Sequence, residues 1–314
     1  MKKRFFALTM AALMAVTVLT GCSSKDEPID NLVFTYVTAP LNVPSIAEKE
    51  KGIFAKAFAE DGISVEYVEL TSGADQTQAL ATGDVQVLYA VGATSVILSA
   101  ANGADIKVLN MYSRSPEAFC LFAQDKNLTT PESLRGKTIA GPAGTILHEL
   151  LVSYLAAADM TIDDVNYVNM SIPESKAALD GGSVDIAMLA GAAAYTAKQQ
   201  GCSLVTDGTG LVDAIIAVAV TEEFYNAHPE IIEKLKSAQD ELAAFLAENE
   251  EEALQITADT LGLEPSAVKE MYTQYDFSTE IKESDRIGFQ RTADFMLETG
   301  MIETELDTDS LFFE

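Results

Sequence analysis

Hydrophobic positions repeat with two different periods along most of the chain, and each period predicts a different element. From Leu32 onward, short β-branched and aromatic runs alternate with longer amphipathic stretches. The short runs predict strands and the longer stretches predict helices, because side chains share a face at every second residue of a strand and about every 3.6 residues of a helix. Strands are expected at about 32–37, 65–70, 85–89, 106–111, 138–140, 165–170, 184–189, 203–206 and 214–220.

A helix is expected after most of these strands. Glycines such as Gly52 and Gly83 mark helix ends, because a glycine readily adopts the left-handed backbone that closes a helix. Pro131 marks a helix start, since proline suits the first helical position. Among the strands, helices are expected at about 45–51, 73–80, 93–101, 146–158, 173–179 and 192–200, and one is expected to begin at 131. After the last strand, only helices are expected, one beginning at 229 and others at 251–261, 265–272 and 286–299.

The alternation of strand and helix predicts an α/β fold with sheets of the parallel type. The strands fall into two sets of about four, separated near Phe119. Two lobes with a ligand site between them are the simplest arrangement of two such sets.

The N-terminus resembles a secretion signal rather than part of the fold. Lys2, Lys3 and Arg4 precede an uncharged stretch at 5–20, which is shorter than the roughly 20 residues of a transmembrane helix. The stretch ends in Leu19-Thr20-Gly21-Cys22, which looks like a bacterial lipobox. We therefore expect a lipoprotein signal peptide at 1–21, a lipid on Cys22, and a lipidated tether at 22–30 that holds the protein on a membrane surface. The alternative is a buried apolar helix with a chance cysteine.

Charge and composition exclude several kinds of protein. The chain has 314 residues, with 20 Lys+Arg against 48 Asp+Glu, and a formal charge of −28. Nucleic-acid binding is excluded as a main function, because affinity for phosphates depends on Lys and Arg. With 3 Cys and 2 His, no zinc cluster is expected, and neither a metal nor a cofactor is predicted. Cys120 and Cys202 could form a disulfide outside the cytoplasm or remain free thiols.

Candidate binding residues gather in the loops that follow the strands. In α/β sheets, ligands bind beyond the carboxyl ends of the strands. The loops at 38–45, 71–73, 92–95 and 141–145 are small and polar, so a ligand can approach the backbone N–H groups that begin the next helices. Ordinary capping explains any one of these loops, whereas four together favour a polar ligand. The candidate residues are Thr38, Asn42, Ser72, Gly73, Gly92, Ala93, Thr94, Gly144, Thr145, His148 and Gly191.

Several segments, in this order and spacing, resemble a known family. They include Glu50-Lys51-Gly52-Ile53-Phe54, Ser72-Gly73-Ala74-Asp75, Leu134-Arg135-Gly136-Lys137 and Asp180-Gly181-Gly182-Ser183-Val184-Asp185. The chain is similar to substrate-binding lipoproteins of ABC importers, in the nitrate/sulfonate/taurine-binding family that also contains binders of thiamine-pyrimidine precursors. The resemblance covers about 32–306.

The resemblance implies a two-lobe type II periplasmic-binding-protein fold. Lobe 1 would comprise 31–118 plus 220–314 and carry the C-terminal helices, and lobe 2 would comprise 119–219. Two crossing strands, near 119–122 and 216–218, would form the hinge. Ligand would close the lobes, and the closed protein, a monomer, would deliver a small molecule to a permease and its ATPase.

The chain departs from the family's pattern in one ligand loop. Many relatives have an aromatic and an acidic residue after the strand that ends near Met188, whereas this chain has Leu189-Ala190-Gly191-Ala192. An anion, a zwitterion, a cation and a neutral heterocycle therefore all stay open as ligands.

Three functions follow from these observations. The first is an extracytoplasmic binding component of an importer, without catalysis. The second is a ligand-sensing surface lipoprotein, which a neighbouring membrane kinase or cyclase gene would favour. The third is an enzyme on the same fold, related to thiamine-pyrimidine synthases. The candidate loops carry no paired carboxylates and no Ser/His arrangement, which disfavours the enzyme.

Overall fold

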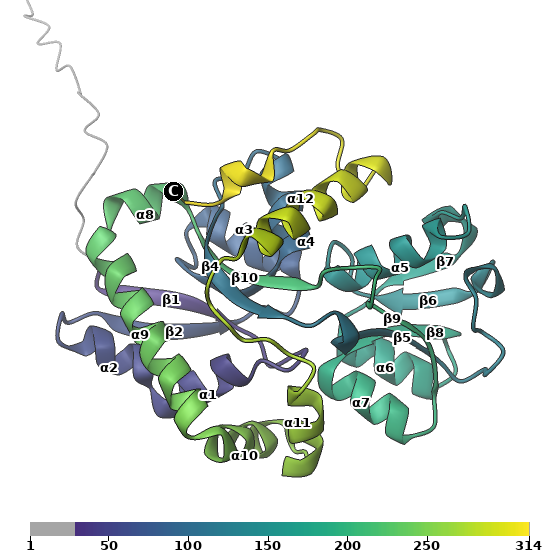
Figure 1. Ribbon diagram of the computed structural model, residues 1–314, viewed down its shortest axis with the longest axis horizontal. Coiled ribbons are helices and arrows are strands. Elements are labelled where there is room, and N and C mark those ends of the chain that lie inside the picture. Colours follow the sequence, from purple (N-terminus) through teal and green to yellow (C-terminus); the bar gives the residue numbers. More distant parts are fainter. Residues whose placement is uncertain (1–28, 314) are drawn as a thin grey trace, which may run out of the picture.

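The structure is a computed structural model that describes residues 29–313, and its strands form sheets in two separate regions (Figure 1). A five-stranded sheet is built from residues between 119 and 207, while a two-stranded and a three-stranded sheet use residues 31–114 and 215–220. The exact lobe boundaries at 118 and 219 stay a prediction. The signal peptide, Cys22 and most of the tether lie outside the described residues.

The sheets of lobe 1 combine parallel and antiparallel strands. Strand β1 (Asn31–Tyr36) pairs in parallel with β2 (Ser64–Glu69). Strand β10 (Ile215–Val220) lies between β3 (Leu88–Gly92) and β4 (Lys107–Arg114) and is antiparallel to both. The sheets expected to be of the parallel type are therefore mixed, because β10 enters lobe 1 from the opposite end, on the chain's return from lobe 2.

The sheet of lobe 2 is also mixed, in the order β7-β6-β8-β5-β9. Strand β6 runs parallel to β7 and β8, whereas β5 runs antiparallel to β8 and β9. The chain enters this lobe through the short turn Pro116–Ala118 just before β5 and leaves it through 208–214 just before β10. The strand bounds are Phe119–Ala123 for β5, Thr138–Gly141 for β6, Asn166–Asn169 for β7, Ile186–Ala190 for β8 and Ser203–Asp207 for β9.

Helices follow the strands much as expected. Gly52, with a φ of 60°, ends α1 and begins α2. The expected helix from Pro131 is a single turn, η2 (Pro131–Leu134), because the chain turns at Gly136 (φ 72°) two residues later. The helices before the C-terminal group are α1 (Val43–Lys51), α2 (Ile53–Ala59), α3 (Gly73–Thr82), α4 (Ala93–Ala101), α5 (Ile146–Ala156), α6 (Ile172–Asp180) and α7 (Gly191–Gln199).

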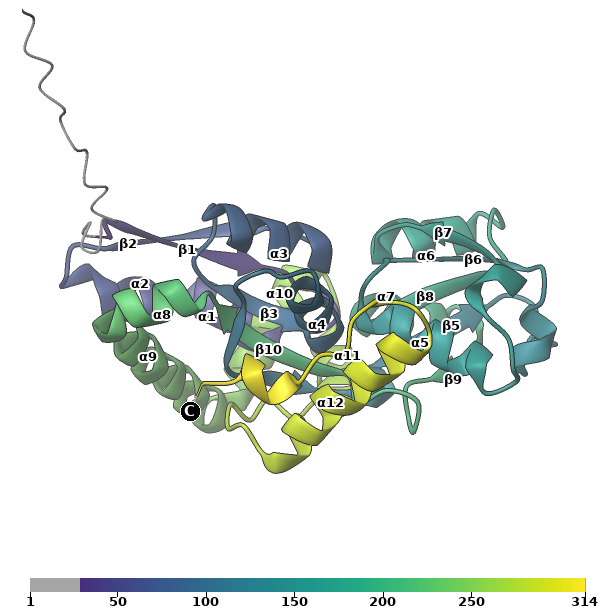
Figure 2. The same ribbon diagram turned by 90° about the horizontal axis from the view of Figure 1, so that it is seen from above.

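The C-terminal helices wrap around lobe 1 and reach toward lobe 2. Helix α9 packs against α1 and α2 through an apolar stripe that includes Ile232, Leu235 and Leu242, and α11 approaches α7. Figure 2 shows α12 extending toward α5 of lobe 2. These helices are α8 (Glu222–Ala227), α9 (Pro229–Glu248), α10 (Glu250–Leu261), α11 (Pro265–Tyr272) and α12 (Glu283–Glu298).

Candidate ligand-binding cleft

A cleft lies between the two lobes, and loops from both lobes line it. Lobe 1 contributes the segments around 37–42, 71–76 and 90–95, and lobe 2 contributes 142–147 and Ile172. The enclosed space is about 90 Å³, well below the roughly 300–1,000 Å³ typical of ligand sites. The lobes therefore lie close together in this structure, and a ligand requires them to separate for entry.

Three helix N-termini converge on this cleft. Gly73, Gly92 and Thr145, which line it, lie at the first position or the N-cap of α3, α4 and α5. No side chain caps the N-terminus of α4 or of α5. Backbone N–H groups and the helix dipole at such termini favour a negatively charged group on the ligand.

Two buried amide side chains add hydrogen-bond acceptors to the same cleft. Asn42 is 1% exposed and Gln76 is 4% exposed, and both line the cleft. Their NH₂ groups are held by backbone carbonyls: Asn42 Nδ2 donates to Val37 O at 2.9 Å, and Gln76 Nε2 donates to Leu70 O at 2.9 Å. Asn42 Oδ1 and Gln76 Oε1 have no hydrogen-bond partner within the described part of the chain. Because an unsatisfied buried acceptor is costly, these oxygens suit a donor group on a ligand.

The rest of the cleft wall is apolar apart from the hydroxyl side chains of Thr71 and Ser95. Among the residues that the structure describes, no side chain lining this cleft is ionisable. An anionic group would therefore be held by backbone N–H groups, and an alkyl or ring portion would contact hydrocarbon. The apolar lining residues are Val37, Ala39, Pro40, Ala90, Phe119, Pro142, Ile146, Leu147, Ile172 and Ile216.

The structure brings four of the expected binding residues together in the cleft: Asn42, Gly73, Gly92 and Thr145. The other seven lie around it. Ser72 uses its hydroxyl to accept the N–H of Asp75, so it acts as an ordinary helix cap. Thr38, Ala93, Thr94, Gly144, His148 and Gly191 are not among the lining residues.

Two of those residues, Gly144 and His148, support the loop that precedes α5. The backbone N–H of Gly144 donates to His148 Nδ1 at 3.2 Å, and the Gly144 carbonyl accepts a hydrogen bond from Ser95 Oγ of lobe 1 at 2.9 Å. The His148 ring stacks on Tyr167 with 5.1 Å between ring centroids. Burial lowers the pKa of His148, so the neutral imidazole accepts the Gly144 N–H. His148 thus holds the loop and does not line the cleft.

Gly191 lies where a loop of lobe 2 touches a loop of lobe 1. Its φ is 52°, and a Cβ added there would lie 1.5 Å from Pro40 O. The next residue, Ala192, donates its N–H to the same carbonyl at 3.3 Å. Only glycine permits this approach, because any side chain would collide with the Pro40 backbone.

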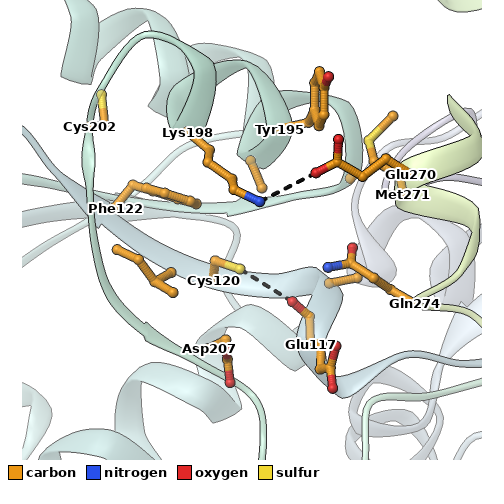
Figure 3. A pocket seen from close by; sticks show the side chains of 14 residues that line it. Glu117, Cys120, Phe122, Tyr195, Lys198, Cys202, Asp207, Glu270, Met271 and Gln274 are labelled. Atoms are coloured by element: carbon orange, nitrogen blue, oxygen red, sulfur yellow. Dashed lines mark hydrogen bonds and ion pairs between the residues drawn. The ribbon is translucent and has the colours of Figure 1, made fainter. Parts of the chain in front are cut away.

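A side pocket, distinct from the cleft, lies between α7, β5 and α11 (Figure 3). Lys198 of α7 forms an ion pair with Glu270 of α11 at 3.4 Å. Cys120 and Cys202 also line it, and both are free thiols, so they do not form the disulfide left open above. Burial raises the pKa of Cys120 to about 12, which makes its thiol unreactive at neutral pH.

Residues 29–313 contain no group of three or more His, Cys, Asp or Glu side chains placed to hold a metal. Across that same range, no helix has the length and apolar character needed to cross a membrane.

Sequence reasoning missed Gln76 and the apolar wall of the cleft, and it named the loop at 92–95 without naming Ser95 as a binding residue. Gln76 lies one turn after Gly73 on α3. Its position in the first turn of a helix that begins at a candidate loop was the signal that could have identified it. Phe119 and Ile216 gave no signal, because they belong to apolar strands that look like ordinary core.

Comparisons with known proteins agree with this architecture. The family model described as NMT1/THI5 like matches residues 41–253. A Bacillus subtilis (strain 168) protein, named for binding aliphatic sulfonates, is 25% identical over 315 residues, covering 98% of this chain and 93% of its own. The taurine-binding periplasmic protein of Escherichia coli (strain K12) is 28% identical over 222 residues, covering 69% of this chain and 67% of its own.

Solved structures show the same fold. The alkanesulfonate-binding protein SsuA from Xanthomonas axonopodis pv. citri, bound to MOPS, superposes with a TM-score of 0.82 at 20% identity, covering 92% of this chain and 99% of that one. A Candida albicans protein with the generic periplasmic binding protein fold gives a TM-score of 0.71 at 15% identity, covering 91% of this chain and 96% of that one. The expected two-lobe α/β fold is confirmed. Because the family model matches more than half of the chain, the chain belongs to the NMT1/THI5-like family.

Proposed function

We propose that the chain is the extracytoplasmic solute-binding component of an ABC importer and captures a small organic sulfonate between its lobes. The observation that carries this proposal is the convergence of the N-termini of α3, α4 and α5 on one interlobe cleft. The names of the sulfonate- and taurine-binding relatives support the same ligand class.

A sulfonate fits the electrostatics of the cleft. The chain's formal charge of −28 repels anions at long range, so an anionic ligand needs strong local donors. N–H groups at three helix N-termini supply such donors without a cationic side chain. A sulfonate has three oxygens that can accept hydrogen bonds from these N–H groups.

The other end of the ligand should carry a hydrogen-bond donor. Asn42 Oδ1 and Gln76 Oε1 are unpartnered acceptors in the cleft, and both belong to neutral side chains. An ammonium group, as in taurine, would satisfy them, while the apolar wall would contact the short alkyl chain. Ethanesulfonate has the same length of carbon chain but no donor, so we expect it to bind more weakly than taurine.

Anchoring and delivery complete the proposal. A lipid on Cys22 would hold the protein, as a monomer, on the outer face of the membrane. The expected hinge positions 119–122 and 216–218 lie in β5 and β10, so ligand would close the lobes about these strands and the segments just before them, 115–118 and 208–214. The closed form would dock on a permease with its ATPase.

The cleft supports binding without chemistry over the enzyme alternative. Within the described part of the chain, its lining offers no thiol, imidazole, amine or carboxylate that could act as a nucleophile or a general base. A sensing lipoprotein would use the same cleft, and only its partner would differ.

Calorimetric titration of the fragment from Ser24 onward with taurine and ethanesulfonate tests the proposal. We expect one site per chain, with taurine bound more tightly. Gly92→Val should abolish binding while the ligand-free protein melts as before, because its side chain would enter the cleft beside Ile146. Ala59→Val, at an exposed position on α2, is the matched control and should bind normally. Normal binding by Gly92→Val would show that the ligand binds elsewhere.

A further inference from the structure

One buried carboxylate joins the two lobes beside the cleft. Glu149, in the first turn of α5 in lobe 2, is 5% exposed. It accepts a hydrogen bond from Thr94 Oγ1 of α4 at 2.5 Å and another from Thr292 Oγ1 of α12 at 3.0 Å. Both threonines belong to lobe 1, and Figure 2 shows α12 reaching toward α5 at this point. Glu149 is therefore bonded across the lobe interface at both of its oxygens.

No cation in the part of the chain that the structure describes compensates for this carboxylate. Within residues 29–313, Glu149 forms no salt bridge, and the nearest guanidinium along α12, that of Arg291, is paired with Asp213 at 2.9 Å. The charge of Asp213 further disfavours an ionised Glu149. Neither α4 nor β8 carries an ionisable side chain. The remaining ionisable groups on α5 and on the elements that contact it are His148 and Tyr154 of α5, Cys120 of β5, Glu132 of η2, Asp163 and Asp164 of the turn at Ile162–Asp164, and Glu283, Asp285, Arg286, Asp294 and Glu298 of α12.

We propose that Glu149 couples closure of the lobes to the uptake of one proton, so that the affinity for ligand increases as the pH falls. This inference rests on the proposed function, because it assumes that ligand binds to the closed form. Glu149 does not line the cleft, so it acts through the lobe contact and not through the ligand.

The direction of the effect follows from burial. When the lobes separate, Glu149 loses its lobe 1 neighbours and returns toward the ordinary pKa of 4.5, whereas burial in the closed structure raises its pKa to about 7. Closure therefore takes up a proton between these two values. The stabilisation of the closed form is fully present below the lower pKa and is lost as the pH rises through the higher one.

The neutral acid fits the same hydrogen-bond partners. A threonine hydroxyl can donate or accept, so one of Thr94 and Thr292 can reverse its role when Glu149 carries a proton. A glutamine has the same shape and also presents one acceptor and one donor. Glu149→Gln should therefore imitate the protonated form at every pH.

Calorimetric titration with taurine and ethanesulfonate between pH 5 and pH 8.5 tests this inference. For the natural protein we expect affinity to fall by as much as about tenfold per pH unit up to pH ~7 and then to level off. Near pH 6, titrations in two buffers of different ionisation enthalpy should show uptake of close to one proton. Ethanesulfonate has no group that titrates in this range, so the effect belongs to the protein.

Two variants and a control separate Glu149 from the other carboxylates. Glu149→Gln should bind with an affinity that varies little with pH, and at pH 8 it should bind more tightly than the natural protein. Glu233→Gln removes one exposed negative charge on α9 and should keep the natural pH dependence. Thr292→Val removes a donor that favours the ionised form, so its affinity should continue to fall above pH 7. An unchanged pH dependence in Glu149→Gln would overturn the inference.

A ligand-free measurement distinguishes failure of this inference from failure of the proposed function. If neither sulfonate binds at any pH, the proposed ligand class is wrong. Small-angle X-ray scattering of the free proteins then decides about Glu149, because the protonated form should favour lobe closure even without ligand. We expect the radius of gyration of Glu149→Gln to match that of the natural protein at pH 5 and to be smaller than it at pH 8.5. A difference that stays constant with pH would contradict the role given to Glu149.

Discussion

Single residues decide how closely the two lobes approach. Gly191 meets the Pro40 carbonyl, Ser95 donates to the Gly144 carbonyl, and Glu149 accepts from two threonines of lobe 1. These contacts surround the cleft without lining it, apart from Ser95 and Pro40. Residues that govern closure are thus largely separate from residues that would contact ligand.

Gly191→Ala should prevent full closure. A methyl group there would collide with Pro40 O, so we expect taurine affinity to fall by at least about tenfold, which corresponds to about 1.4 kcal/mol. Gly182→Ala carries a similar backbone cost, because its φ is 67°, but nothing lies near the added Cβ. Calorimetry should show a loss only for Gly191→Ala, and equal losses in both variants would contradict a steric role.

Cys22→Ser tests the anchor, which lies outside the described residues. Without a thiol, no diacylglycerol can be attached, so we expect the variant to carry no lipid and the natural protein to carry one. Mass spectrometry of the two proteins would measure the lipid directly. Acylation of the variant would show that the lipid is carried elsewhere.

At the residue level, the sequence predicts helix starts better than it predicts side-chain roles. Gly73, Gly92 and Thr145 were expected in the cleft because small polar residues begin helices after strands, and the structure places them there. Glu149 gave no such signal, because an acidic residue in a first helical turn is ordinary. Its burial depends on α4 and α12, which approach α5 only in the folded molecule.

At the level of elements, the presence and order of the strands and helices were predictable, whereas the pairing of the strands was not. The β-branched runs and the glycine stops located most strands and helices to within a few residues, as with α1 ending at Gly52. Strand β3 begins three residues later than expected, at Leu88. Val85 and Val87 are buried in the core, which gave them the pattern of a strand, but they precede the residues of β3. The antiparallel direction of β10 depends on the path of the chain through lobe 2. The local pattern of hydrophobic residues does not predict that path.

Helix α12 is fixed to the sheet of lobe 1 by a buried ion pair, and this pair predicts a stability effect. Arg114 of β4 donates to Asp285 through Nε at 2.6 Å and through Nη2 at 2.5 Å. Asp285→Ala would remove the buried carboxylate that binds Arg114 at two nitrogens and would leave only the more exposed Asp276, at 3.6 Å. We therefore expect a loss of about 3 kcal/mol in the free energy of unfolding.

Urea unfolding measures that loss, and a second ion pair of α12 provides the control. Asp309, the partner of Arg286, has a side chain that is 73% exposed. Asp309→Ala should therefore cost no more than about 1 kcal/mol. Equal losses in the two variants would show that burial does not set the value of the Arg114–Asp285 pair.

At the scale of the whole molecule, two sheets on either side of a narrow cleft account for capture of a ligand. Helix N-termini from both lobes face the same space, so a ligand bound there bonds to both lobes and favours the closed arrangement. The two-lobe fold was foreseen from the pattern and the family resemblance, although each set contains five strands where about four were expected. The ligand class was not foreseen, since the acceptors that we propose for it belong to two neutral amides, Asn42 and Gln76.

Thermal unfolding of the fragment from Ser24 onward, with a panel of candidate ligands, tests the central claim most directly. The panel comprises taurine, ethanesulfonate, nitrate, thiamine, its pyrimidine precursor, polyamines and amino acids. A ligand at 100 times its Kd stabilises the folded state by about 2.7 kcal/mol, which raises the melting temperature by several degrees. We predict the largest increase with taurine and a smaller one with ethanesulfonate. An increase with polyamines or thiamine but not with either sulfonate would contradict the account.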